Sequence, residues 1–332
     1  MTRAGKALLA AMVASAVVSS SAEAQIAPGS NINVTAPTGG GKQFWTDRMV
    51  QHDWRIQQNV CTGHCRLLDD KDFRRAWGSY DGCRQEFERL RAKQGLSAVG
   101  GRVVVTVHGL GRSRQSMAGL GKYLAKEGGY TWINVSYAST RDTIDAHGRA
   151  LAEIVGQLTE ADEVSFVGHS LGNLVIRRWL AYRAEADPQE QGPPLGRIVM
   201  LAPPNQGAQI AEQFHNSELF QLVYGLSGSQ LSRGWDEIER RLAIPPCPFG
   251  IIAGGRGEDG ANNPLLAGDD DFVVTVEEAR LAGAADFLVV PTLHTFFMDD
   301  KHVRECTLRF LQHGYFVSEQ DRRTIPAIEP PR

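Results

Sequence analysis

Ser170 lies at the centre of the pattern Gly168-His169-Ser170-Leu171-Gly172, between an apolar run and the start of a helical pattern. A sharp turn from strand to helix is strained, and glycine is needed wherever a Cβ would meet neighbouring backbone. The hydroxyl of a serine at such a turn projects from the end of the strand and can attack an acyl carbonyl. The pattern therefore predicts Ser170 as a nucleophile, with Gly168 and Gly172 shaping the turn.

A nucleophilic serine requires a base that takes its proton and a carboxylate that orients the base. His294 follows the last apolar run, and loops at the carboxyl ends of parallel strands are where ligands bind open sheets. Three successive aspartates precede another apolar segment, and Asp271 is the preferred acid because burial of the residues after it would fix its backbone. Asp269 and Asp270 remain alternatives. Crowded aspartates are also typical of a polar turn or a structural calcium loop, here from Asp259 to Asp271.

The negative oxygen that develops on the attacked carbonyl needs hydrogen-bond donors, which backbone N–H groups commonly supply. The segment His108-Gly109-Leu110-Gly111 follows an apolar run, and its glycines let the backbone turn toward a reacting group. We expect the N–H groups of Leu110 and Leu171 to be the two donors, helped by the positive end of the helix after the serine. His108 and Gly109 are expected to support this loop rather than to transfer protons.

The elements that position these residues lie between residues 99 and 317, where apolar runs alternate with amphipathic helical patterns. This alternation predicts a mostly parallel, three-layered α/β sheet with helices on both faces. The expected strands are Val103–Val107, Thr131–Val135, Val164–Val167, Ile198–Leu201, Phe249–Ala253 and Phe287–Val290. The expected helices are Gln115–Lys126, Thr143–Leu158, Leu171–Arg183, Val276–Leu281 and Lys301–Leu311.

An insertion rich in apolar residues interrupts the alternation between residues 203 and 246. It is either a lid over an acyl-binding cleft or a set of helices that completes the core, and periodicity does not separate the two. Residues 318–332 are expected to form a C-terminal tail.

Residues 1–24 have the composition of a secretory signal peptide, with Arg3 and Lys6 before an apolar stretch and Ala22-Glu23-Ala24 before the expected cut. The apolar stretch is too short for a comfortable membrane span. We therefore expect a mature protein that begins at Gln25 and is periplasmic or extracellular, without a stable membrane span. Residues 25–42 have no apolar period and are expected to form a flexible lead-in.

Between residues 43 and 98, charged residues alternate with aromatic and aliphatic ones in a pattern that favours helix over strand. We expect a small helical N-terminal extension that covers an edge of the main sheet.

The five cysteines are expected to form disulfides in an oxidising compartment, with one thiol left over because their number is odd. Cys61 and Cys65 flank His64, but no second ligand pair stands at the spacing of a zinc site. The sequence therefore favours disulfides over a zinc site at these cysteines.

The overall composition is globular, with 42% hydrophobic and 22% charged residues in a chain of 332. The formal net charge is −3, and the sequence contains no Lys/Arg cluster with interleaved aromatic residues. Nucleic acid is therefore not an expected partner.

Together these motifs resemble the α/β-hydrolase superfamily, and within it the small bacterial triacylglycerol lipases and related serine esterases. The resemblance covers roughly residues 101–316 and rests on the segments at 108–111, 168–172, 271–274 and 293–294. It implies Ser170 as nucleophile, Asp271 as acid and His294 as base. The chain departs from the family at Phe272, where many members carry glycine, and in residues 44–93, which have no counterpart in the minimal lipases.

The expected function is that of a serine hydrolase that cleaves carboxylic esters through an acyl-serine intermediate and requires no cofactor. Its expected partner is an ester with an acyl chain, either free in solution or presented at a lipid interface. The same triad would serve a thioesterase or an acyltransferase, and an idle hydrolase fold could act as a binding module.

Overall fold

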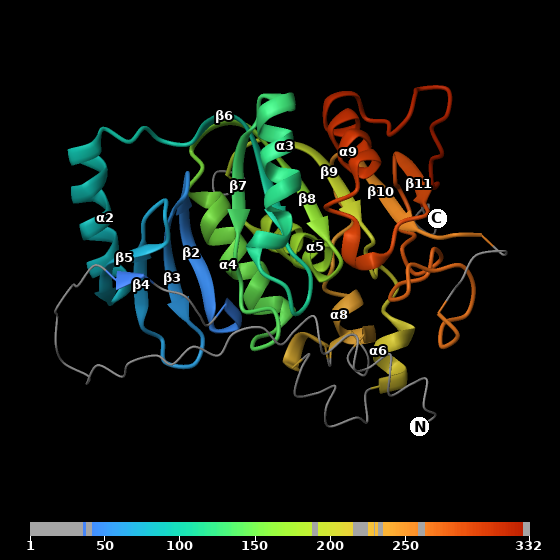
Figure 1. The fold of residues 1–332 in the computed structure, drawn as a ribbon, viewed down its shortest axis with the longest axis horizontal. Coiled ribbons are helices and arrows are strands. Elements are labelled where there is room, and N and C mark those ends of the chain that lie inside the picture. Colours follow the sequence, from blue (N-terminus) through green and yellow to red (C-terminus); the bar gives the residue numbers. More distant parts are fainter. Residues whose placement is uncertain are drawn as a thin grey trace.

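The computed structural model describes residues 36–37, 42–187, 192–214, 225–228, 230–231, 235–257 and 263–327. The expected signal peptide and most of the expected lead-in lie outside these residues. Within them, no helix is long and apolar enough to cross a membrane. Figure 1 shows two sheets, a small one formed by the N-terminal segment and a larger one that extends to the other end of the molecule.

The larger sheet has six parallel strands in the order β11-β10-β9-β8-β6-β7. All six expected strands are present, which confirms the predicted parallel sheet. Their bounds are β6 (Gly100–Val107), β7 (Thr131–Val135), β8 (Glu160–His169), β9 (Leu195–Leu201), β10 (Phe249–Gly254) and β11 (Asp286–Val290).

Helices cover both faces of this sheet because successive strand residues point to opposite sides. Val103 and Val105 of β6 share one core with α4 (Ile144–Gly156) and α5 (Leu171–Glu185). Val104 faces the other core, together with residues of α3 (Ala118–Gly128) and α9 (Lys301–His313). A short 3₁₀ turn, η2 (Arg114–Met117), leads into α3. The three-layered arrangement is that of the α/β-hydrolase fold.

Strand register brings two of the predicted motifs together. Val107 of β6 pairs with Gly168 of β8. The loop at 108–111 therefore leaves its strand at the same level as the turn at Ser170. His169, the last residue of β8, pairs with Leu201 of β9 on the other side.

The N-terminal extension is a sheet with one helix, so the predicted helical extension is wrong. Five antiparallel strands lie in the order β1-β5-β4-β3-β2, and one helix packs on them through Phe87 and its neighbours. The elements are β1 (Ala36–Pro37), η1 (Lys42–Phe44), β2 (Trp45–Gln51), β3 (Trp54–Asn59), β4 (Cys65–Leu68), β5 (Phe73–Gly78) and α2 (Tyr80–Gln94). Polar side chains on β2, β3 and β4 are buried, which removes the alternation of apolar and polar residues that marks a strand. These side chains are Asp47, Arg55, Gln57 and Arg66.

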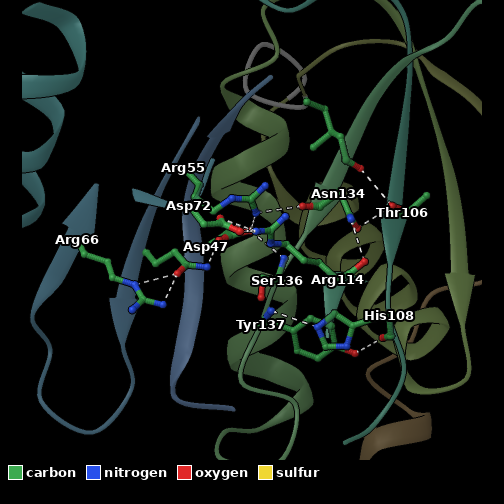
Figure 2. Close-up of polar contacts among 12 residues, drawn as sticks. Asp47, Arg55, Arg66, Asp72, Thr106, His108, Arg114, Asn134, Ser136 and Tyr137 are labelled. Atoms are coloured by element: carbon green, nitrogen blue, oxygen red, sulfur yellow. Dashed lines mark hydrogen bonds and ion pairs between the residues drawn. The ribbon is translucent and has the colours of Figure 1, made fainter. Parts of the chain in front are cut away.

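The N-terminal sheet is joined to the larger domain along β2. The carboxylate of Asp47 accepts hydrogen bonds from Arg55 at 2.9 Å, from Gln57 at 2.7 Å and from the backbone N–H of Ser136 at 2.7 Å. Arg48 of the same strand forms an ion pair with Glu153 of α4. Figure 2 shows this junction, with Asp47 between Arg55 and Ser136.

The predicted helix Val276–Leu281 is wrong, because the chain makes only a turn there. The carboxylate of Glu278 accepts hydrogen bonds from the N–H and the hydroxyl of Thr275, at 2.8 and 3.0 Å. The bonds between Thr275 and Glu278 are those of a helix N-terminal capping box. No helix follows over the described residues 276–283, because the turn ends at Ala279 and the chain reverses at Gly283, whose φ is +89°.

The described parts of the insertion belong to the core. Helices α6 (Gln209–Phe214) and α8 (Trp235–Glu239) lie at one end of the domain (Figure 1). Ile210, Leu231 and Ile238 are buried in the core that α4 and α5 also share. Residues 215–224, which carry much of the apolar character of the insertion, lie outside the described residues. The expectation of a lid is therefore untested.

The five cysteines are free thiols, which corrects the expected disulfides. Cys247 and Cys306 pack in the cores on opposite faces of the larger sheet, and Cys61 is exposed in a turn. Cys65 and Cys83 share the core of the N-terminal sheet without a bond between them. Burial raises the pKa of the Cys83 thiol to about 12 and that of Cys247 to about 11, so the reactive thiolate is disfavoured at both positions.

Candidate active site

Ser170 occupies the sharp turn between β8 and α5. Its backbone angles, φ 51° and ψ −125°, lie outside the regions that residues other than glycine normally adopt. The backbone N–H of Ser170 donates to the carbonyl of Leu201 at 2.9 Å, which fixes the turn to the neighbouring strand. The strain and its support are those of a nucleophile elbow.

The two glycines of the turn have no space for a side chain. A Cβ at Gly172 would lie 2.3 Å from the carbonyl oxygen of Val107, and one at Gly168 would lie 2.2 Å from Oδ1 of Asn173. Real Cβ atoms do not approach that closely, so close packing of strands β6 and β8 against α5 requires glycine at both positions. This is the physical role that the sequence assigned to them.

Asn173 was not singled out from the sequence. Its Nδ2 donates to the carbonyls of Ser170 and Leu201 at 3.1 and 3.2 Å, and the side chain is fully buried. The amide therefore stabilises the elbow from inside the first turn of α5. A signal was present in the sequence, because Asn173 is polar amid the otherwise apolar residues that open this helix.

Asp271 and His294 are in direct contact. Oδ2 of Asp271 lies 2.8 Å from Nδ1 of His294, and the backbone N–H of His294 donates to the carbonyl of Asp271 at 3.0 Å. The other carboxylate oxygen accepts from the N–H groups of Val273 and Val274 at 3.0 and 2.8 Å. The Asp271 side chain is completely buried, so both of its oxygens are held in place.

The other two aspartates have different partners. Asp270 accepts from the N–H groups of Asn263 and Phe272, and Asp269 accepts from the N–H of Arg256 at 2.6 Å. Within the described residues, neither carboxylate forms a hydrogen bond with His294. The geometry thus separates three neighbours that the sequence left as alternatives.

Phe272 stands where many α/β-hydrolases carry glycine, and its backbone has the conformation that glycine favours. Its φ is +78°, the left-handed region in which glycine is usually found. The N–H of Phe272 donates to Oδ1 of Asp270 at 2.7 Å, a local bond that holds the unusual backbone. The turn therefore keeps the conformation that glycine normally provides, with a phenylalanine in its place.

His169 connects the elbow to the Asp271–His294 pair. Its Nε2 lies 3.0 Å from the carbonyl oxygen of His294, and the centres of the two imidazole rings are 4.8 Å apart. Because a carbonyl only accepts, Nε2 of His169 carries the proton. Burial, with the nearby His294 and Arg112, lowers the pKa of His169 well below its usual value. His169 is thus a neutral packing residue that brings the residue after it, Ser170, next to His294.

The loop at 108–111 lies against the elbow. A Cβ at Gly109 would lie 2.9 Å from Nδ1 of His169 and 3.1 Å from the Cβ of Ser170. The N–H of Gly111 donates to the hydroxyl of Ser139 at 3.0 Å. By contrast, the N–H groups of Leu110 and Leu171 have no hydrogen-bond partner within the described part of the chain. Leu171 is fully buried and Leu110 is partly buried, and unpaired N–H groups at buried positions are rare.

His108 supports the loop from behind. Its carbonyl accepts from the hydroxyl of Tyr137 at 2.5 Å, and its ring is stacked on the Tyr137 ring (Figure 2). The side chain is fully buried, and burial lowers the pKa of His108 to about 4. His108 therefore stays neutral, as a structural residue does, in agreement with the role expected from the sequence.

No group of three or more metal-ligating side chains occurs among the residues that the structure describes. Part of the expected calcium loop, residues 258–262, lies outside them. The calcium expectation is therefore untested.

The arrangement fits acyl transfer to a serine. The carboxylate of Asp271 accepts the proton on Nδ1 of His294 and leaves Nε2 free to take one. Ser170 and His294 each keep 9% of their surface exposed, at the carboxyl ends of the strands. Ser170 and His294 form no direct hydrogen bond in the described chain, and such catalytic bonds often tighten only when substrate binds.

Comparison with protein families gives one match. Residues 99–232 match the family described as "Putative serine esterase (DUF676)". The match includes Ser170 and the loop at 108–111 and ends before Asp271 and His294. The match supports ester hydrolysis as the class of reaction. No curated protein matches the chain.

Several solved structures are similar. A lipase from Bacillus licheniformis in its propeptide form is 18% identical, with a TM-score of 0.45 over 69% of this chain and 52% of that one. This chain thus spans about half of the length of that lipase. A gene product from Listeria innocua is 15% identical, with a TM-score of 0.47 over 69% of this chain and 99% of that one. A thermophilic esterase from Thermogutta terrifontis is 16% identical, with a TM-score of 0.41 over 65% of this chain and 91% of that one.

Proposed function

We propose that this protein is a serine hydrolase that cleaves carboxylic esters through an acyl-serine intermediate. Ser170 is the nucleophile, His294 the base and Asp271 the residue that orients the base. The single observation that carries the proposal is the Asp271–His294 contact of 2.8 Å, held beside a strained serine by His169. The family match at residues 99–232 supports the same class of reaction.

The first half of the reaction forms the acyl-enzyme. Oγ of Ser170 attacks the ester carbonyl carbon while its proton moves to Nε2 of His294. The carbonyl oxygen becomes negative and accepts hydrogen bonds from the N–H groups of Leu110 and Leu171, which need no rearrangement to donate. When the intermediate collapses, the ester C–O bond breaks, and the leaving alcohol takes the proton from His294.

The second half releases the acid. A water molecule gives a proton to His294 and attacks the acyl carbon, and the same two N–H groups stabilise the second oxyanion. The carboxylic acid leaves, and the proton returns to Oγ of Ser170. No step requires a metal or an organic cofactor.

The reaction is tested with nitrophenyl esters of increasing acyl length. We expect turnover by the parent protein and a loss of roughly 10³-fold or more in Ser170→Ala. Ser116→Ala is the matched control, because the Ser116 hydroxyl bonds only to the backbone of its own turn. Equal activity in the parent and in Ser170→Ala would contradict the proposal.

The same assays decide the finer substrate class. A preference for long chains with activation at an oil surface is expected of a lipase, and a preference for short chains without activation is expected of an esterase. A competing alcohol that diverts acyl groups into a new ester would instead indicate an acyltransferase.

The proposal includes export from the cytoplasm, because residues 1–24 have the pattern of a signal peptide. Mass spectrometry of the protein collected outside the cytoplasm is expected to find Gln25 at its N-terminus. Protein that stays in the cytoplasm with Met1 in place would contradict export.

A further inference from the structure

One side chain of the N-terminal segment reaches the loop that we assign to the oxyanion. Nε2 of Gln43 donates to the carbonyl of Arg112 at 2.7 Å. Its Oε1 accepts from the hydroxyls of Ser139 and Thr140, both at 3.1 Å, and from the N–H of Thr140 at 3.3 Å. Gln43 thus bonds to the loops after β6 and β7 at once, although both lie far from it in sequence.

Ser139 transmits this contact to the backbone beside Leu110. Its hydroxyl donates to Gln43 and accepts from the N–H of Gly111 at 3.0 Å. Gly111 has a φ of +67°, and the N–H of Arg112 closes the turn onto the carbonyl of Gly109 at 3.2 Å. The Gly111 N–H is therefore engaged in a hydrogen bond that holds the loop. The preceding N–H, that of Leu110, has no partner within the described chain.

A second line of contacts, from β2 of the N-terminal sheet, reaches the other end of the loop. The N–H of Asp47 donates to the carbonyl of Ser136 at 2.9 Å, and the Asp47 carboxylate accepts from the N–H of Ser136. Tyr137, the next residue, bonds and stacks on His108 (Figure 2). The N-terminal segment therefore supports the loop at both ends, at Gly111 through η1 and at His108 through β2.

The loop is also tied to the segment that carries the base. Nη2 of Arg112 donates to the carbonyl of Thr295 at 3.2 Å, one residue after His294. A shift of Arg112 would thus disturb both the oxyanion loop and the base. Gln43 limits that shift, because it holds the carbonyl of the same residue.

We propose that Gln43 is a positioning residue for ester hydrolysis, which sets the Leu110 N–H at the oxyanion through Ser139 and through the carbonyl of Arg112. This inference rests on the proposed function. It assigns the N-terminal sheet, which lies outside the family match, a part in the reaction.

The first test compares Gln43→Ala with Gln51→Ala. Gln51 lies at the other end of β2, and its Nε2 also bonds a backbone carbonyl, that of Ser97, at 2.8 Å. Removal of an oxyanion donor costs about 10²- to 10³-fold in kcat, so a displaced donor should cost about 10- to 100-fold. We expect that loss in kcat for Gln43→Ala with KM near the parent value, since the oxyanion bond is made only in the transition state. Gln51→Ala should keep the parent kcat.

The second test uses a trifluoromethyl ketone, whose adduct with serine places a negative oxygen where the reaction's oxyanion forms. Its affinity should fall in Gln43→Ala by the same factor as kcat/KM. Ser139→Ala should also lower the affinity, and the double variant should lose less than the two single losses combined, because the Gln43–Ser139 contact is common to both variants. A purely structural role would lower the melting temperature without this selective loss.

The outcomes are distinct. Gln43→Ala with parental kcat and parental affinity for the ketone, or an equal loss of kcat in Gln51→Ala, would overturn the assignment of Gln43 while leaving the esterase proposal in place. A parent protein that neither hydrolyses esters nor reacts with a fluorophosphonate at Ser170 would overturn the proposed function and this inference with it.

Discussion

Asp271 holds His294 by two hydrogen bonds, from Oδ2 to Nδ1 at 2.8 Å and from the carbonyl of Asp271 to the N–H of His294 at 3.0 Å. The first bond fixes the tautomer of the imidazole, because a carboxylate accepts and Nδ1 must then carry the proton. The second bond fixes the backbone of the loop, so that the ring cannot turn away without breaking it. Nε2 is left as the nitrogen that can receive a proton from the serine.

Asp271→Asn should lower kcat strongly, because an amide can donate to Nδ1 and favour the wrong tautomer. In serine proteases the equivalent change costs about 10⁴-fold, and we expect a loss of about 10³- to 10⁴-fold here. Initial rates on a nitrophenyl ester check this. Asp270→Asn is the matched control, since Asp270 contacts backbone N–H groups rather than His294. A comparable loss in both variants would argue against a special role for Asp271.

Gly172→Ala should destabilise the fold, because the new Cβ would lie 2.3 Å from the carbonyl oxygen of Val107. Overpacking of this kind costs about 1–3 kcal/mol or more, measurable by urea denaturation. Gly156→Ala is the control: this helix residue has no heavy atom within 4 Å of the added Cβ. That change should leave stability unchanged or raise it by about 0.4–1 kcal/mol. Equal effects at the two positions would contradict the close packing of the elbow.

The protein should lose stability in acid through its buried histidines. Burial lowers the pKa of His108 to about 4 and that of His147 to about 3, both from 6.5. Between pH 6.5 and pH 4 the unfolded chain binds protons that the native chain does not, so the free energy of unfolding falls as the pH falls. For His108 alone the loss is about 3 kcal/mol.

Urea denaturation at pH 7, 6, 5 and 4.5 measures this loss. His108→Asn should flatten the dependence on pH, whereas Gly156→Ala, which changes no titratable group, should not change it. A free energy of unfolding that stays constant from pH 7 to 4.5 would rule out this role for the buried histidines.

The larger sheet could be predicted from the sequence because its strands are apolar and buried on both faces. Strands such as β6 are buried on both faces, so Val103, Val104 and Val105 form an uninterrupted apolar run. The elbow and the loop at 108–111 follow such strands directly, and strand register alone brings them together. The sequence favoured Asp271 but left Asp269 and Asp270 as alternatives, because the choice depends on which carboxylate a distant histidine approaches.

The N-terminal sheet could not be predicted, because its strands β2 and β3 bury charge. Asp47 and Arg55 pair at 2.9 Å with side chains 0 and 1% exposed, and a pattern that counts charged residues as solvent-facing reads such strands as helix. The contact between Gln43 and Arg112 is equally invisible in sequence. It joins residues 69 positions apart whose types carry no motif.

Arg55→Ala should be strongly destabilising, because it leaves the Asp47 carboxylate buried without its cation. Breaking a buried pair from one side costs about 3–5 kcal/mol. Urea denaturation should show this loss, while Arg89→Ala, which removes an exposed partner of Glu86, should leave the midpoint at the parent value. A parental midpoint in Arg55→Ala would contradict the account of the junction between the two sheets.

The most direct test of the central claim is the reaction of the protein with a fluorophosphonate, followed by peptide mass spectrometry. We expect one covalent label per chain, located on Ser170, and a loss of ester hydrolysis in proportion to labelling. Ser170→Ala should take up no label, and Asp271→Asn should be labelled much more slowly than the parent. An unlabelled parent protein, or a label on another residue with hydrolysis intact in Ser170→Ala, would contradict the account.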